Sequence, residues 1–206
     1  MIVMPSNNSK WQVHYWQGKY GGLGHLYSLD GKRGPYPHLP YALDNGRYPA
    51  FSSGKVWDYD KYILLLDWAK LADIQPMWAL VPDIVGDPEG TLEEWGKWSG
   101  LLKEYGFPLA FAAQDGHTPS DIPEDAEVVF IGGTTKWKRE NIKTFCDAFP
   151  RVHVGRINTY KWVRYCHDAG AESCDGTGWF RGNKDQLAEL ERYLSEEAEF
   201  NMWVNK

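Results

Sequence analysis

The sequence places one carboxylate, that of Asp175, in a turn bounded by glycines. Asp175 follows the short segment Ala171–Cys174, and the residues after it read Gly-Thr-Gly. Glycine weakens helices and strands alike, so these glycines indicate a sharp turn or a close approach of the backbone to another group. An aspartate at such a position is a candidate nucleophile or general base. A simple turn is the alternative, because Asp-Gly pairs are common in turns.

Polar residues and glycines recur at the ends of other apolar runs. They are Asp44, Asp83, Gln114, Gly132, Gly133 and Arg156, at the ends of the runs Tyr41–Leu43, Met77–Val81, Leu109–Ala113, Val128–Ile131 and Val152–Gly155. Turn chemistry explains each of them alone. Together they predict one pocket with two or three carboxylates and an amide. Such a pocket suits the binding of a polar ring and acid-base or nucleophilic chemistry on it.

Basic residues follow the same runs. Lys136, Lys138 and Arg139 come after the Gly-Gly pair, Arg156 ends the next run, and Arg181 lies beyond Asp175. Cations at the start of a helix oppose the helix dipole, so a bound anion would give them a purpose. They are therefore candidate contacts to a phosphate backbone, the alternative being solvated helix ends.

Eight apolar runs alternate with segments of helical periodicity. Besides those above, the runs are Met1–Met4, Ala171–Cys174 and Phe200–Val204, and the helical segments are Tyr59–Leu71, Thr91–Tyr105, Trp137–Phe149, Thr159–Ala169 and Asn183–Ala198. This alternation predicts an α/β fold, a compact (β/α)8 barrel in one domain spanning residues 1–206. The chain is short for such a barrel, so we expect trimmed helices.

Two local patterns refine this expectation. The stretch from Pro5 to Pro40 is rich in Gly, Tyr and Pro and has no helical period. We therefore expect a long functional loop in place of the first helix. Thr91 and Glu94 have the spacing of a capping box, which predicts a helix start at Thr91.

Composition sets outer limits on the function. The formal net charge of -6 gives no overall nucleic-acid footprint, so any phosphate contact must come from a local basic patch. The 3 cysteines form no C-x-x-C pair, which argues against a zinc knuckle or a disulfide framework. No apolar run approaches the length of a membrane span. We expect a soluble, cytoplasmic protein that has no contact with a membrane.

With these residues in place, the chain resembles the tRNA-guanine transglycosylase superfamily. It is most similar to a short branch, found in phages and bacterial DNA-modification clusters, that exchanges guanine in DNA for a 7-deazaguanine. The resemblance covers Tyr41 to Arg181. It implies a TIM-like barrel, DNA and a 7-deazaguanine base such as preQ0 as substrates, and no metal or other cofactor. A phage-encoded protein acting in the host cytoplasm would fit it.

The resemblance also assigns roles to individual residues. Asp175 would be the covalent nucleophile, and Asp44, in Asp44-Asn45-Gly46-Arg47-Tyr48, would stand for the family's second essential aspartate and move a proton. Tyr48 would stack on the base. The residues that read the base would be Asp83, Gln114, Gly132 and Gly133.

Three departures separate the chain from the tRNA enzymes. Arg47 replaces a glycine of the family's D-S-G-G turn, and Thr134–Trp137 replaces the extension after Gly-Gly. The zinc subdomain that helps those enzymes to hold RNA is missing, which favours DNA as the substrate. Exchange in tRNA, base excision by an N-glycosidase and a non-catalytic DNA-binding module remain alternatives. The oligomeric state and a DNA-delivering partner protein stay open.

Overall fold

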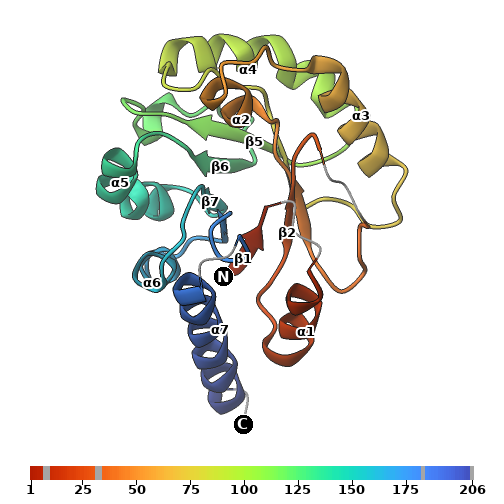
Figure 1. The fold of residues 1–206 in the computed structure, drawn as a ribbon. Helices are drawn as coiled ribbons and strands as arrows, with labels where there is room; N and C mark the ends of the chain where they lie inside the picture. Colours follow the sequence, from red (N-terminus) through yellow and green to blue (C-terminus); the bar gives the residue numbers. More distant parts are fainter. Residues whose placement is uncertain (7–9, 31–33, 182–183, 205–206) are drawn as a thin grey trace.

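The computed structural model describes residues 1–6, 10–30, 34–181 and 184–204, and its helices and strands alternate along the chain (Figure 1). The strands are β1 (Ile2–Pro5), β2 (His25–Tyr27), β3 (Tyr41–Leu43), β4 (Ala79–Leu80), β5 (Leu109–Ala113), β6 (Val128–Ile131), β7 (Val152–Val154) and β8 (Ser173–Gly176). The helices are α1 (Trp11–Tyr20), α2 (Arg47–Ser52), α3 (Tyr59–Lys70), α4 (Pro88–Lys103), α5 (Thr135–Ala148), α6 (Tyr160–Ala169) and α7 (Lys184–Val204), with a short 3-10 turn at Pro119–Asp121.

All of these strands lie parallel in one sheet that curls into a barrel. Its order is β1-β8-β7-β6-β5-β4-β3-β2. The two edge strands meet through the parallel bridges Val3–Leu23 and Ser6–Leu26, and the Val3 N–H donates to the carbonyl of Gly22 at 2.8 Å. The helices surround this sheet (Figure 1). The predicted compact (β/α)8 barrel is therefore confirmed.

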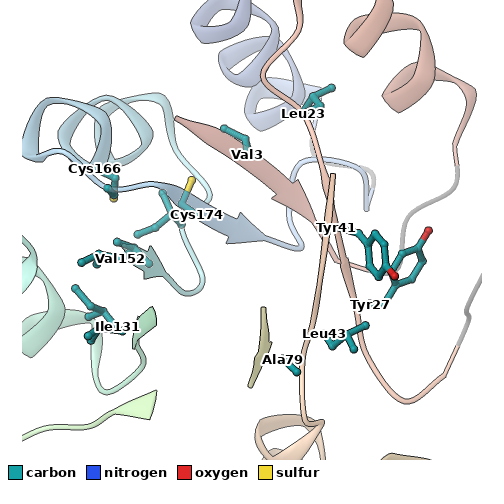
Figure 2. Close-up of a cluster of buried hydrophobic side chains, with 14 of the residues drawn as sticks. Val3, Leu23, Tyr27, Tyr41, Leu43, Ala79, Ile131, Val152, Cys166 and Cys174 are labelled. Carbon is teal, nitrogen blue, oxygen red and sulfur yellow. The ribbon is translucent and has the colours of Figure 1, made fainter. Parts of the chain in front are cut away.

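Apolar side chains fill two layers because successive residues of a strand point to opposite faces. The larger cluster lies between the strands and the helices, where Val3, Ile131 and Cys174 are buried (Figure 2). The smaller cluster fills the barrel interior and includes Met4 and Trp78. The barrel is thus packed below its carboxyl-terminal rim, which leaves the rim as the place for a cavity.

The first connection and the last strand differ from the sequence prediction. The expected loop from Pro5 to Pro40 contains helix α1 and strand β2. Helix α1 buries only Val13 and Trp16, so its sequence carries little helical period. The run Phe200–Val204, predicted as a strand, forms the last turns of α7. The count of eight strands is right, but Asp175 lies in β8, next to its last residue, and not at the end of the seventh strand.

The helix boundaries also differ from those predicted. Helix α4 starts earlier than predicted because Asp87, and not Thr91, caps it: the Asp87 side chain accepts from the Gly90 N–H at 3.0 Å. The Thr91 hydroxyl instead donates to the Asp87 carbonyl at 2.8 Å inside the first turn. The predicted capping box of Thr91 and Glu94 is therefore wrong. The predicted start of the last helix, Asn183, lies outside the described residues.

A pair of leucines on α3 tests how far the outer apolar layer stabilises the barrel. Leu65 is fully buried, whereas its neighbour Leu64 is 58% exposed. We expect Leu65→Ala to lower the free energy of unfolding by about 2–5 kcal/mol, because it leaves a cavity in the core. Leu64→Ala, the matched control, should cost less than about 1 kcal/mol. Urea denaturation followed by circular dichroism measures both, and equal losses would contradict the packing described here.

Candidate active site

The strand ends meet at one cavity of about 520 Å³ at the carboxyl-terminal rim of the barrel. Its floor is apolar and includes Leu26, Leu80 and Phe130. The predicted site residues that line it are Asp44, Tyr48, Asp83, Gln114, Gly132, Gly133, Arg156, Asp175 and Arg181. Residues from strands that are distant in the sequence thus face one space, as the barrel prediction requires.

Asp175 is held by one of its two carboxylate oxygens. Its Oδ1 accepts a hydrogen bond from the Arg156 N–H at 3.0 Å and lies 3.2 Å from Nε2 of His153. Among the described residues, its Oδ2 has one long contact, to the Ser6 hydroxyl at 3.5 Å. Only 5% of Asp175 is exposed. One oxygen is therefore fixed, and the other is the better placed to attack a bound molecule.

His153 orients this carboxylate from below. Its Nδ1 lies 2.8 Å from the Ser173 hydroxyl, and its ring is stacked on Phe130 and edge-on to Trp78, with ring centroids 4.9 and 4.8 Å away. A carboxylate can only accept, so in the contact with an ionised Asp175 the donor is Nε2 of His153. The sequence prediction missed His153. The polar residue within Val152-His153-Val154 was the available signal, since it must face the barrel interior.

Asp44 lies at the end of β3 in a less polar setting. Burial raises its pKa to about 7, and the charges of Asp175 and Asp83 act in the same direction. Hydrogen bonds from the Gly46 N–H, at 3.2 Å, and from Ser28 partly oppose this rise. A carboxyl group with a pKa near 7 can both donate and accept a proton at neutral pH, which general acid-base chemistry requires.

Asp83 is held between two side-chain amides. Its Oδ1 accepts from Asn45 at 2.8 Å and its Oδ2 from Gln114 at 2.7 Å. Burial raises the pKa of Asp83, while these two bonds and the positive charge of Arg47 oppose the rise. A carboxylate has about four acceptor positions, so both oxygens keep capacity for a ligand. Asp83 and Gln114 together form a rigid polar edge of the cavity.

The Gly132-Gly133 turn brings bare backbone to the cavity wall beside Gln114. Gly133 has a φ of 57°, in the region that favours glycine. Asp115 fixes the turn by accepting from the N–H and the hydroxyl of Thr134, at 2.5 and 2.7 Å. A side chain at Gly133 would collide with Asp115 and Trp137. Neighbouring side chains therefore require glycine at this position, and both glycines line the cavity.

Arg156 closes the cavity between these elements. It has a φ of 60°, in the left-handed region that residues other than glycine rarely adopt. Its guanidinium donates to the Gly133 carbonyl and lies over the ring of Tyr48, 4.4 Å from the ring centroid. Tyr48, expected to stack on a base, is thus stacked by Arg156 in this structure and is 43% exposed.

The remaining basic residues are spread over different environments. Lys136 is exposed and Arg181 lies exposed at the cavity, whereas Lys138 is buried and donates to the Gly155 carbonyl. Arg139 lies over the ring of Trp162, 4.4 Å from its centroid. The structure therefore does not bring the five predicted phosphate contacts to one continuous exposed patch.

The described residues hold neither a metal-binding cluster nor a membrane-spanning helix. No cluster of three or more His, Cys, Asp or Glu side chains there has an arrangement that could hold a metal ion. In the same residues, no helix combines the length and the apolar composition needed to cross a bilayer.

Comparisons with known proteins show the fold alone. No protein-family profile and no curated protein sequence matches the chain. Similar solved structures include a protein from Aquifex aeolicus VF5, with 15% identity, a TM-score of 0.57 and coverage of 97% of this chain and 92% of that one. A tryptophan synthase structure from M. tuberculosis has 13% identity and a TM-score of 0.55, over 96% and 91%. A 3-hexulose-6-phosphate synthase from Salmonella typhimurium has 12% identity and a TM-score of 0.55, over 97% and 99%.

These comparisons overturn the family resemblance drawn from the motifs. Two of these barrels are synthases of other kinds, none of the three is named a tRNA-guanine transglycosylase, and no family profile supports the resemblance. That assignment is wrong. The motifs failed because Asp and Gly are common in turns of any fold. At 12–15% identity, the neighbours show the fold and nothing of the chemistry of this chain.

The pKa of Asp44 leads to a test of its environment. Its folded-state pKa of about 7 exceeds the ordinary value of 3.8, so between these pH values the unfolded chain releases a proton that the folded chain keeps. The free energy of unfolding therefore falls as pH rises from about 4 to about 7. An asparagine does not titrate, so we expect the free energy of unfolding of Asp44→Asn not to fall in this way. At pH 8 it should exceed that of the wild type by on the order of a few kcal/mol. Urea denaturation at pH 5 and pH 8 measures it.

The exposed Asp147 on α5 supplies the matched control. Asp147→Asn should follow the wild-type pH dependence. Parallel curves for Asp44→Asn and the wild type would show that Asp44 is well solvated.

Proposed function

We propose that the chain is an enzyme that exchanges guanine in DNA for a 7-deazaguanine base, through a covalent bond between Asp175 and the sugar. The observation that carries the proposal is that three aspartates, at the ends of β3, β4 and β8, line one cavity with different hydrogen-bond partners. Carboxyl groups in unlike environments can divide the tasks of nucleophile, proton carrier and base recognition.

Asp175 has the geometry of the nucleophile. Its Oδ1 is anchored by the Arg156 N–H, so Oδ2 can approach the sugar carbon C1′. In the first step, the Oδ2–C1′ bond forms and the C1′–N9 bond breaks, with its electron pair leaving on the base. In the second step, N9 of the incoming base attacks C1′ and releases Asp175. The two displacements retain the configuration at C1′.

Asp44 suits the proton transfers that these two steps need. The departing base takes a proton at N9, and the incoming base loses one. A pKa of about 7 allows Asp44 to give the first proton and to receive the second at neutral pH. Both transfers balance, since the carboxyl group ends each cycle in the state in which it began.

The Asp83–Gln114 edge matches the hydrogen-bonding edge of guanine. Guanine presents N1–H and an amino group side by side, next to the carbonyl oxygen O6. Asp83 offers acceptors for the first two, while Gln114 and the Gly133 N–H lie on the same cavity for O6. A 7-deazaguanine keeps this edge, so the same contacts serve both bases. A base without these groups would leave the buried Asp83 unpaired.

The cavity mouth supports a polynucleotide substrate. Phe51 and Tyr48 of α2 lie there, 64% and 43% exposed, and Arg181 lies there too. Exposed aromatic side chains stack on bases, and an arginine pairs with phosphates. The target nucleotide must leave the stack to reach Asp175, and such a rim would hold its neighbours.

Loss of the nucleophile is the direct test of the proposal. We expect Asp175→Asn to abolish incorporation of labelled 7-deazaguanine into DNA, because an amide cannot form the glycosyl ester. Nucleoside mass spectrometry of single-stranded and duplex DNA after incubation measures the product, and Asp147→Asn is the control with full activity. A fully active Asp175→Asn variant would refute the assignment. Incorporation into tRNA only, or release of guanine without an acceptor base, would replace the proposal by RNA exchange or by base excision.

A second test addresses base recognition. We expect Asp83→Asn to raise KM for guanine-containing DNA about 10- to 100-fold, the range for one hydrogen bond to a charged group. The rise in KM caused by Asp83→Asn should be much smaller for DNA with hypoxanthine in place of guanine, because hypoxanthine lacks the amino group. A merely structural role of Asp83 would weaken both substrates equally. Steady-state kinetics with the two oligonucleotides separates these outcomes.

A further inference from the structure

A second, smaller cavity lies beside the first at the same end of the barrel. Its volume is about 160 Å³, the space of about five water molecules. The starts of α5 and α6 frame it. Its polar lining comes from Thr135, Lys138, Arg139, Arg156, Asn158 and Thr159. Because Arg156 lines both cavities, the two sites share one wall.

Positive charge is concentrated in this second cavity. Lys138 and Arg139 line it together with Arg156, whose guanidinium reaches the Gly133 carbonyl at the first cavity, and no carboxylate is found among its described lining residues. The whole chain has a formal net charge of -6, so such a group stands out from its composition. Like charges this close repel one another, and a bound anion would relieve the repulsion.

The buried Lys138 distinguishes the second cavity from a solvated surface. Its side chain is buried, with 2% of the residue exposed, and its ammonium group donates to the Gly155 carbonyl. An ammonium group has three N–H donors, so this bond leaves two for a ligand. Burial, and then the charge of Arg156, lower the pKa of Lys138 to about 8, with Asp175 and Cys166 opposing and Arg139 adding to the fall.

Backbone dipoles add to the attraction for an anion. The cavity lies at the N-terminal ends of α5 and α6, where helix dipoles are positive. Thr134 caps α5 by accepting from the Trp137 N–H at 3.3 Å. Thr159, the N-cap of α6, makes no side-chain capping bond and lines the cavity.

We propose that this second cavity binds a backbone phosphate of the nucleic acid whose base enters the first. The inference rests on the proposed function for the identity of the ligand. Arg156 links the two sites. Its backbone N–H donates to Asp175 in the first cavity, and Arg156 also lines the second cavity. A phosphate held there would be separated from Asp175 by Arg156, the residue that both sites share. The cavity selects a phosphodiester, and the base pocket selects the base.

Arg139→Gln tests the proposal by binding and not by activity. Binding of a fluorescent single-stranded oligonucleotide is measured by anisotropy at several salt concentrations, in the Asp175→Asn background so that no turnover occurs. We expect severalfold weaker binding, and a slope of log K against log salt that is shallower by about 0.7, the value for one lost phosphate contact on a single strand. The effect should not depend on the base sequence.

Arg192→Gln is the matched control. Arg192 lies exposed on α7 and stacks on Tyr160 at 4.2 Å, much as Arg139 stacks on Trp162 at 4.4 Å. The control loses the same charge outside both cavities, so its affinity and salt slope should equal those of the background protein. Circular dichroism spectra that match the wild type would show that both variants fold.

Competition with inorganic phosphate shows whether the cavity binds a backbone phosphate of the oligonucleotide or free phosphate. The proposal expects phosphate to compete weakly with the oligonucleotide and to lose that competition in Arg139→Gln. If Arg139→Gln binds phosphate more weakly but the oligonucleotide unchanged, the cavity holds free phosphate, and the proposal is overturned. Unchanged binding of both ligands overturns it too. Because Asp175→Asn needs no base exchange to bind DNA, a failure of the exchange reaction leaves this result readable.

Discussion

The hydrogen bond from the Arg156 N–H to Oδ1 of Asp175 is the contact on which the site depends. It joins the end of β7 to the end of β8 across 3.0 Å. Arg156 adopts a φ of 60° to make it, which costs on the order of 1–3 kcal/mol for a residue other than glycine. The guanidinium bond to the Gly133 carbonyl and the stacking on Tyr48 offset part of this cost. One strained residue thus orients the candidate nucleophile and forms the wall between two cavities.

The packed interior of the barrel sets the electrostatics above it. Trp78 and Phe130 fill the space below the rim, and His153 is wedged between them. This apolar layer is why a carboxyl group at the rim is poorly solvated, which raises the pKa of Asp44. Burial also raises the pKa of Asp83, and the bonds from Asn45 and Gln114 and the charge of Arg47 oppose that rise. Hydrogen-bond donors thus oppose the effect of burial on both carboxyl groups.

The sequence predicted the barrel and the composition of its rim for a physical reason. Parallel strands bring their carboxyl ends to one edge, so the residues after each apolar run had to meet, whatever their distance along the chain. It could not predict β2, a segment of three residues that pairs with β3 and, through single bridges, closes against β1. Nor could it place Phe200–Val204, whose apolar run fits a strand but continues α7. Short runs carry too little periodicity to settle such cases.

Arg47 shows why a motif is weaker evidence than a site. It follows Asp44 by three residues and replaces a glycine of the turn with which the motif was compared. Its guanidinium pairs with Glu94 and lies 4.0 Å from the ring centroid of Trp57, and it is not among the described residues that line the cavity. The same short segment thus holds one charged group for packing and another, Asp44, facing the cavity. The sequence spacing does not show which of the two faces the cavity. The contact of α2 with α4, made by Arg47 and Glu94, shows that it is Asp44. A function argued from the groups that face the cavity therefore survives the loss of the family resemblance.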